Sequence, residues 1–274
     1  MIKMSRLALF SMALLIPSLA WASGDIRVLP AGIVAPGFGD SILQNPATLA
    51  YTPGTDLELL YTPTTTYTGN VAWANSTYGI GGGYTQTNYP GSAYMTQDAY
   101  GAFGYRNGNF GIGGDYTLPV GTSYSGAGEL AVGANFGNGK ETNYALVFNN
   151  LGSFGSLGSF GTLSAGVGYI EPKKFNLELN LTLPPFATGF FASGSTYSLL
   201  AAGCIYAGSF GFGFTASYSY SFPTSGSSSP SYTSSTLYLP LSYTAAVSFQ
   251  PDKFPTLSAR FLGSGITFAM DFLL

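Results

Sequence analysis

Residues 175–183 read Phe-Asn-Leu-Glu-Leu-Asn-Leu-Thr-Leu, an unbroken alternation of apolar and polar side chains. Because successive side chains of a strand point to opposite faces of a sheet, this period of two gives one apolar face and one polar face. The same alternation recurs over residues 210–222 and 237–249. The sequence therefore predicts an all-β chain whose strands have two unlike faces.

The length of these runs separates a membrane barrel from a soluble β-sandwich, which also alternates. The runs cover 9 to 13 residues, whereas strands of soluble proteins usually have about 5–6 residues and strands that cross a bilayer need about 9–11. Their polar faces are mostly Gly, Ser, Thr and Asn, which suit a barrel interior better than bulk water. A membrane helix over residues 199–214 is disfavoured, because four glycines interrupt that stretch. We therefore favour a transmembrane antiparallel β-barrel.

The composition excludes several classes of function. Only 8% of the 274 residues are charged and the mean hydropathy is +0.23, which fits strands that are half apolar and half polar. The chain has no His, which removes the usual general base and the commonest metal ligand. Its single cysteine, Cys204, excludes an intramolecular disulfide. We expect no enzymatic activity, no cofactor, no metal and, with a net charge of −3, no nucleic-acid partner.

Residues 1–22 have the pattern of a secretory signal peptide. Lys3 and Arg6 precede an apolar run over residues 7–19, and Ala20-Trp21-Ala22 forms a small-residue cleavage site. A signal peptide and a barrel together predict the outer membrane of a Gram-negative bacterium, with its lipid as the main partner.

The strand pattern gives about fourteen strands, with twelve as the alternative. The predicted strands cover residues 56–63, 69–75, 78–87, 97–106, 110–118, 126–136, 142–150, 162–170, 175–183, 196–206, 210–222, 235–249, 255–262 and 265–274. With both termini in the periplasm, the even-numbered connections are periplasmic turns, and all of them are short. The odd-numbered connections are mostly longer and rich in Gly, Ser and Pro. We predict a barrel over residues 55–274, preceded by residues 23–54, which lack the alternation and are long enough to fold into the lumen as a plug.

Residues 37–50, Gly-Phe-Gly-Asp-Ser-Ile-Leu-Gln-Asn-Pro-Ala-Thr-Leu-Ala, resemble the start of the FadL-type transporters of hydrophobic compounds. In that family an Asn-Pro-Ala tripeptide follows a glycine-rich stretch just before the first strand, and here it is Asn45, Pro46 and Ala47. The resemblance implies a fourteen-stranded monomeric barrel with an amino-terminal hatch. It also implies passage of fatty acids or similar apolar molecules through the barrel wall.

Six charged residues fall on the polar side of predicted strands, where they would face the lumen: Glu58, Asp115, Glu129, Glu178, Arg260 and Asp271. In an open channel, five acids against one base would favour cations. Two alternatives to hydrophobic transport therefore stay open: a passive porin for small polar solutes or cations, and a structural or surface-interaction barrel without transport. The residues alone do not identify a ligand or an oligomeric state.

Overall fold

The computed structural model describes residues 32–35, 41–63, 65–89, 91, 95–120, 128–149, 151, 161–172, 174–184, 196–221, 241–249, 256–262 and 265–273. The predicted signal peptide, residues 1–22, lies outside the described residues. So do residues 23–31 and 36–40 of the predicted plug.

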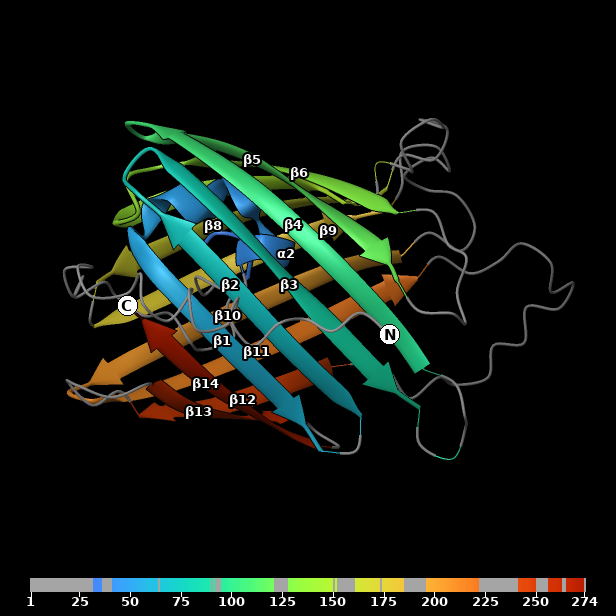
Figure 1. Cartoon of the computed structure of the whole chain (residues 1–274). Helices are drawn as coiled ribbons and strands as arrows, with labels where there is room; N and C mark the ends of the chain where they lie inside the picture. Colours follow the sequence, from blue (N-terminus) through green and yellow to red (C-terminus); the bar gives the residue numbers. More distant parts are fainter. Residues whose placement is uncertain are drawn as a thin grey trace, which may run out of the picture.

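The described residues form fourteen strands and two short helices. Their bounds are α2 (Ser41–Gln44), η1 (Pro46–Tyr51), β1 (Gly54–Thr62), β2 (Thr66–Ala74), β3 (Tyr78–Asn88), β4 (Met95–Asn107), β5 (Phe110–Pro119), β6 (Glu129–Phe136), β7 (Glu141–Phe148), β8 (Leu163–Glu171), β9 (Phe175–Leu183), β10 (Thr196–Ala207), β11 (Phe210–Ser221), β12 (Leu241–Phe249), β13 (Thr256–Leu262) and β14 (Gly265–Leu273). Each strand pairs antiparallel with its neighbours in sequence, and β14 pairs with β1 to close the barrel (Figure 1). The prediction of an antiparallel all-β barrel is confirmed.

Strand bounds agree best where the alternation is cleanest. β9 has the predicted bounds, and β11 ends one residue before the predicted residue 222. β2 begins at Thr66 rather than residue 69, because Thr66 and Thr68 extend its ladder with β3. In β12, the predicted residues 235–240 lie outside the described part.

Tight turns gather at one end of the barrel, which we call the turn end. They join β2 to β3, β4 to β5, β6 to β7, β8 to β9 and β10 to β11. Gly108 and Gly208 have φ of +59° and +61° in two of them, a conformation that glycine adopts without steric cost. The β1–β2 connection at the other end is also short, with Thr65 N–H donating to Thr62 O, so the predicted contrast between the two ends is not uniform.

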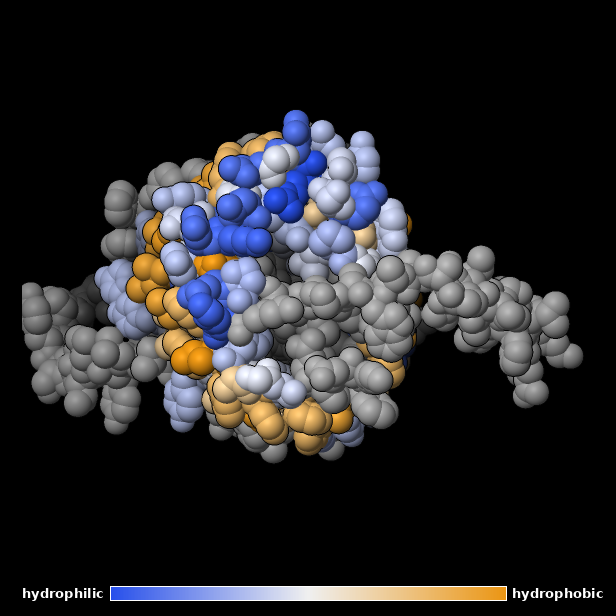
Figure 2. All heavy atoms as spheres, turned by 90° about the vertical axis from the view of Figure 1, so that its left-hand side faces the viewer, coloured by the Kyte–Doolittle hydropathy of each residue, from blue (hydrophilic) through white to orange (hydrophobic). Residues whose placement is uncertain are grey.

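The outward face of the strands is apolar. In β9, Leu177, Leu179 and Leu181 are exposed, whereas the alternating Asn176, Glu178 and Asn180 are buried. Figure 2 looks at the turn end, where hydrophilic residues gather over the upper part and hydrophobic residues lie along the left flank and the lower edge. Apolar side chains on the outward face are unfavourable in contact with water and favourable in contact with the hydrocarbon of a bilayer.

Aromatic side chains form pairs near the two ends of this apolar surface. At the turn end the pairs are Tyr78–Phe103, Tyr78–Tyr105, Phe110–Phe136, Tyr169–Phe175 and Phe210–Phe249. At the other end Tyr61 and Tyr67 lie with ring centroids 5.1 Å apart. Aromatic side chains at both ends of a lipid-facing surface are typical of the two interfaces between a bilayer and water.

Helices α2 and η1, which precede β1, lie inside the barrel (Figure 1). We call residues 32–35 and 41–51 the inner segment. Its helix η1 packs against β2 to β6, and Ile42 and Leu49 are fully buried against Ala72, Ala74 and Tyr100 of the wall. Among the described residues, no helix has both the length and the apolar character needed to span a bilayer.

Candidate functional site

Asn45 joins the two parts of the inner segment. Its backbone is extended, its Oδ1 accepts from Ala47 N–H at 3.2 Å, and its Nδ2 donates to Ile33 O at 2.8 Å. Pro46 follows at the first position of η1, where a missing N–H costs no helical hydrogen bond. The side chain of Asn45 is fully buried, so it acts as a helix cap and as a crosslink at once.

The hydroxyl of Thr48 holds α2 against η1. Its Oγ1 lies 3.0 Å from the Ser41 hydroxyl and 2.8 Å from the Asn45 carbonyl oxygen. All three residues are buried, so these polar groups satisfy one another inside the barrel. The predicted motif Asn45, Pro46 and Ala47 therefore lies at the centre of a short, internally bonded unit.

A row of glycines on the wall receives this unit. Gly79, Gly104, Gly113 and Gly133 are cross-strand partners in turn across β3, β4, β5 and β6. A Cβ at Gly113 would lie 2.5 Å from Pro46 C and 2.6 Å from Ala47 N, and one at Gly79 would lie 2.7 Å from Leu49 Cβ. Side chains at Gly104 and Gly133 would meet Pro46 O and Asn45 Oδ1. We call these four residues the glycine row, and it lets two backbones approach closely.

Residues 32–35 are bonded to two other parts of the wall. Val34 N–H donates to Glu178 Oε2 on β9 at 2.9 Å, and Asn135 Nδ2 on β6 donates to Val34 O at 3.4 Å. Gly166 and Gly168 on β8 leave room for the Val34 side chain. The predicted charge Glu178 thus binds the inner segment directly.

The other predicted charges have unequal environments. Glu58 is buried and accepts from Asn70 Nδ2 at 2.7 Å, and Asp115 is buried two residues beyond Gly113. Glu129 has the inward phase but is exposed as the first residue of β6. Backbone register sets Asp271 opposite Glu58 and Arg260 opposite Ala246. The side chains of Asp271 and Arg260 lie outside the described part of the structure.

The sequence-based reasoning missed a group of buried inward polar residues. These are Asp56, Asn70, Asn135, Asn143, Asn176 and Asn180. Their signal is an Asn or Asp at alternate positions of strands whose other face is apolar. The single cysteine of the chain, Cys204, is buried beside the Asn176 side chain. In the part of the chain described, no group of three or more Cys, Asp or Glu side chains is arranged to hold a metal ion.

Arg106 ties the inner segment to the turn end. Its guanidinium carbon lies 4.1 Å from the ring centroid of Tyr51, and its nitrogens donate to Gly108 O and Asn138 O. Burial raises the pKa of the Tyr51 hydroxyl, while the charge of Arg106 opposes that rise. The last residue of η1 is thus held by a cation–π contact.

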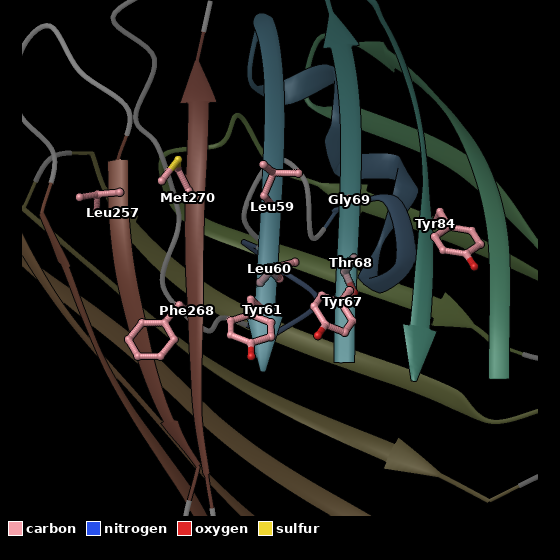
Figure 3. Close-up of a pocket in the computed structure, with 10 residues that line it drawn as sticks. All are labelled: Leu59, Leu60, Tyr61, Tyr67, Thr68, Gly69, Tyr84, Leu257, Phe268 and Met270. Carbon is pink, nitrogen blue, oxygen red and sulfur yellow. The ribbon is translucent and has the colours of Figure 1, made fainter. Parts of the chain in front are cut away.

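A groove of 690 Å³ lies on the apolar outer wall over β1, β2 and β14 (Figure 3). Gly69 leaves its floor open, because only Leu59 Cδ2, at 3.7 Å, lies within 4 Å of where a Cβ would be. Ten residues line it: Leu59, Leu60, Tyr61, Tyr67, Thr68, Gly69, Tyr84, Leu257, Phe268 and Met270. Its volume lies within the range of ordinary ligand pockets, about 300–1,000 Å³.

Comparison with solved structures identifies the fold class. No protein-family model and no curated protein matches this sequence. The Ralstonia pickettii toluene transporter TbuX matches over 92% of this chain and 96% of its own, with 12% identity and a TM-score of 0.52. A mutant of the Rhodopseudomonas blastica porin matches over 80% of this chain and 98% of its own, with 10% identity and a TM-score of 0.40. The KdgM porin matches over 80% and 96%, with 9% identity and a TM-score of 0.40. At such identities, the likeness to TbuX defines a β-barrel fold.

Proposed function

We propose that this protein is an outer-membrane barrel that passes small hydrophobic molecules, with residues 23–54 as its plug. The proposal rests on the docking of Asn45, Pro46 and Ala47 on the glycine row. A segment packed so closely against the inner wall narrows the lumen, which favours a plugged barrel over an open channel. The fold is shared with a protein described as a toluene transporter. The apolar groove over Gly69 gives the outer wall a place for an apolar molecule.

The membrane location is supported by the apolar outward face and by the aromatic pairs near its two ends. We expect Leu179→Arg, in the middle of β9, to destabilise the barrel by about 2–4 kcal/mol, since it places a charge near the bilayer midplane. Thr142→Arg is the matched control, because Thr142 is exposed beside a tight turn, where the cost falls to about 0–1 kcal/mol. Denaturant unfolding in lipid vesicles measures both values. Equal losses for the two variants would contradict a bilayer centred on β9.

The plug is tested by the conductance of the refolded mature protein in a planar bilayer. We expect the complete chain to be silent and a chain lacking residues 23–54 to carry a steady current, because the deletion removes the inner segment, whose helix η1 packs against β2 to β6. Uptake of an apolar solute by vesicles containing the complete chain then tests transport.

A large current from the complete chain would instead favour the passive porin, to which the inward acids Glu58, Asp115 and Glu178 would give cation preference. Silence in both chains, together with no uptake of an apolar solute, would favour a structural barrel. The three functions therefore give three different results in one pair of assays.

A further inference from the structure

Gly69 opens the groove in the outer wall because it interrupts a line of large outward side chains. Tyr67 and Val71 are exposed outward residues of β2, and Gly69 stands between them. Hydrogen-bonded register sets Leu59 of β1 and Tyr84 of β3 on either side of Gly69. One missing side chain among four large ones therefore leaves a slot in an otherwise continuous apolar surface.

Two adjacent rows of outward positions form this groove, and Figure 3 shows them one above the other. The first row runs across β14, β1 and β2 and contains Phe268, Tyr61 and Tyr67. The second row runs from β13 to β3 and contains Leu257, Met270, Leu59, Gly69 and Tyr84. The side chains on both rows are aliphatic, aromatic or thioether groups, which suit a hydrocarbon chain.

The polar boundary of the outer wall lies directly beside the first row. Gln86 of β3 is the register partner of Tyr67, and Gln97 of β4 is the register partner of Gln86. Gln97 Nε2 donates to Gln86 Oε1 at 3.3 Å, and Gln86 Nε2 donates to Asn88 Oδ1 at 3.2 Å. Amide side chains are unfavourable in hydrocarbon, so this cluster marks the level at which the bilayer becomes polar.

The tyrosines of the first row are oriented to match that boundary. The hydroxyl groups of Tyr61 and Tyr67 point away from Leu59, and their rings border the groove (Figure 3). Tyrosine takes this orientation where a protein passes from hydrocarbon to head groups, with its ring in one and its hydroxyl in the other. The groove therefore begins at the depth where the acyl chains of a lipid leaflet begin.

The groove offers hydrogen bonds at its polar end but no positive charge. The four strands β1, β2, β3 and β14 contain neither Lys nor Arg. A phosphate or carboxylate would find only hydroxyl and amide groups beside the first row. Recognition must therefore come from the hydrocarbon chain rather than from the charge of a head group.

We propose that this groove binds one acyl chain of a membrane lipid, with the lipid head group at the level of Tyr61 and Tyr67. The inference rests on the membrane location and is independent of transport. Hydrocarbon surrounds the barrel in any case, so the gain comes from van der Waals contact on several sides of the chain instead of one. A lipid also brings its polar and apolar parts in the order that the wall presents, with amides and hydroxyls first and Gly69 beyond them.

The test is native mass spectrometry of the refolded mature protein in detergent micelles, titrated with palmitoyl-oleoyl phosphatidylethanolamine. We expect one lipid molecule to be retained by each barrel. Gly69→Leu should weaken this binding at least about tenfold, because the new side chain fills the slot. A Cβ at Gly69 meets only Leu59 Cδ2, at the ordinary contact distance of 3.7 Å, so the variant is expected to fold. Phosphatidylglycerol with the same chains should bind as tightly, since no charge recognises the head group.

Gly101→Leu is the matched control, because Gly101 is an exposed outward glycine of β4 that does not line the groove. It should retain the lipid as the wild type does. If Gly69→Leu does not fold, Gly69→Ala fills part of the slot and should give a smaller loss of affinity in the same direction.

Three results would overturn the proposal. The first is a wild type that retains no lipid, and the second is a Gly69→Leu variant that retains it at wild-type affinity. The third is a wild-type dimer that only Gly69→Leu dissociates, which would assign the groove to a second copy of the chain. None of these results changes the conductance expected with and without residues 23–54, so the proposed plug and the lipid site fail separately.

Discussion

Gly113→Leu is expected to drive the inner segment off the wall and make the barrel conduct. A Cβ at this position would lie 2.5 Å from Pro46 C, 2.6 Å from Ala47 N and 2.7 Å from Phe103 O. All three are backbone atoms, which cannot swing aside as the tip of a side chain does. Overpacking commonly costs about 1–3 kcal/mol. Here the inner segment can relieve the clash between its Pro46 and Ala47 and the new side chain only by leaving the glycine row.

The readout is the single-channel current of the refolded variant, compared with the wild type, which we expect to be silent, and with the chain that lacks residues 23–54. Gly101→Leu is the matched control on the adjacent strand, because a Cβ there points outward and meets only Gly81 O, at 3.8 Å. It should stay silent. A silent Gly113→Leu barrel whose inner segment resists protease as well as the wild type does would contradict the docking described above.

The fold could be predicted because local alternation determines it. β9 has the predicted bounds since each of its side chains repeats the period of two, and Asn107-Gly108 marks the β4–β5 turn through chemistry that two residues carry by themselves. The predicted start of β2 was wrong by three residues. Thr66 and Thr68 look like loop residues, and only their pairing with Thr87 and Thr85 places them in the sheet.

The candidate site was only half predictable. Asn45, Pro46 and Ala47 stand out as a contiguous motif, whereas the glycine row is spread over four strands between residues 79 and 133 and exists only once the register is known. The burial of the charged side chains could not be predicted either. Glu58 and Glu129 both occupy inward-facing positions of their strands, yet Glu58 is buried in the middle of β1 and Glu129 is exposed where β6 begins.

Asn45→Ala is expected to loosen the inner segment while leaving the barrel closed on itself. The substitution removes the donor to the Ile33 carbonyl oxygen and the acceptor for Ala47 N–H. A buried group left without its partner costs about 1–3 kcal/mol, and a lost helix cap costs about 1 kcal/mol. Since β1 pairs with β14 through contacts that Asn45 does not touch, the strands should keep their pairing.

Hydrogen exchange measures this local loosening. The amide of Ala47 should exchange roughly 10- to 100-fold faster in the variant, as a segment that opens more often exposes it to water. Amides in the middle of β9 should keep their wild-type rates. Asn75→Ala is the control, because the Asn75 side chain likewise accepts from backbone N–H groups, those of Thr77 and Tyr78, but in an exposed turn. If Ala47 and β9 gain exchange together, Asn45 supports the whole barrel and the inner segment has no separate stability. If neither gains, the crosslink to Ile33 contributes nothing, and the glycine row alone must hold the segment in place.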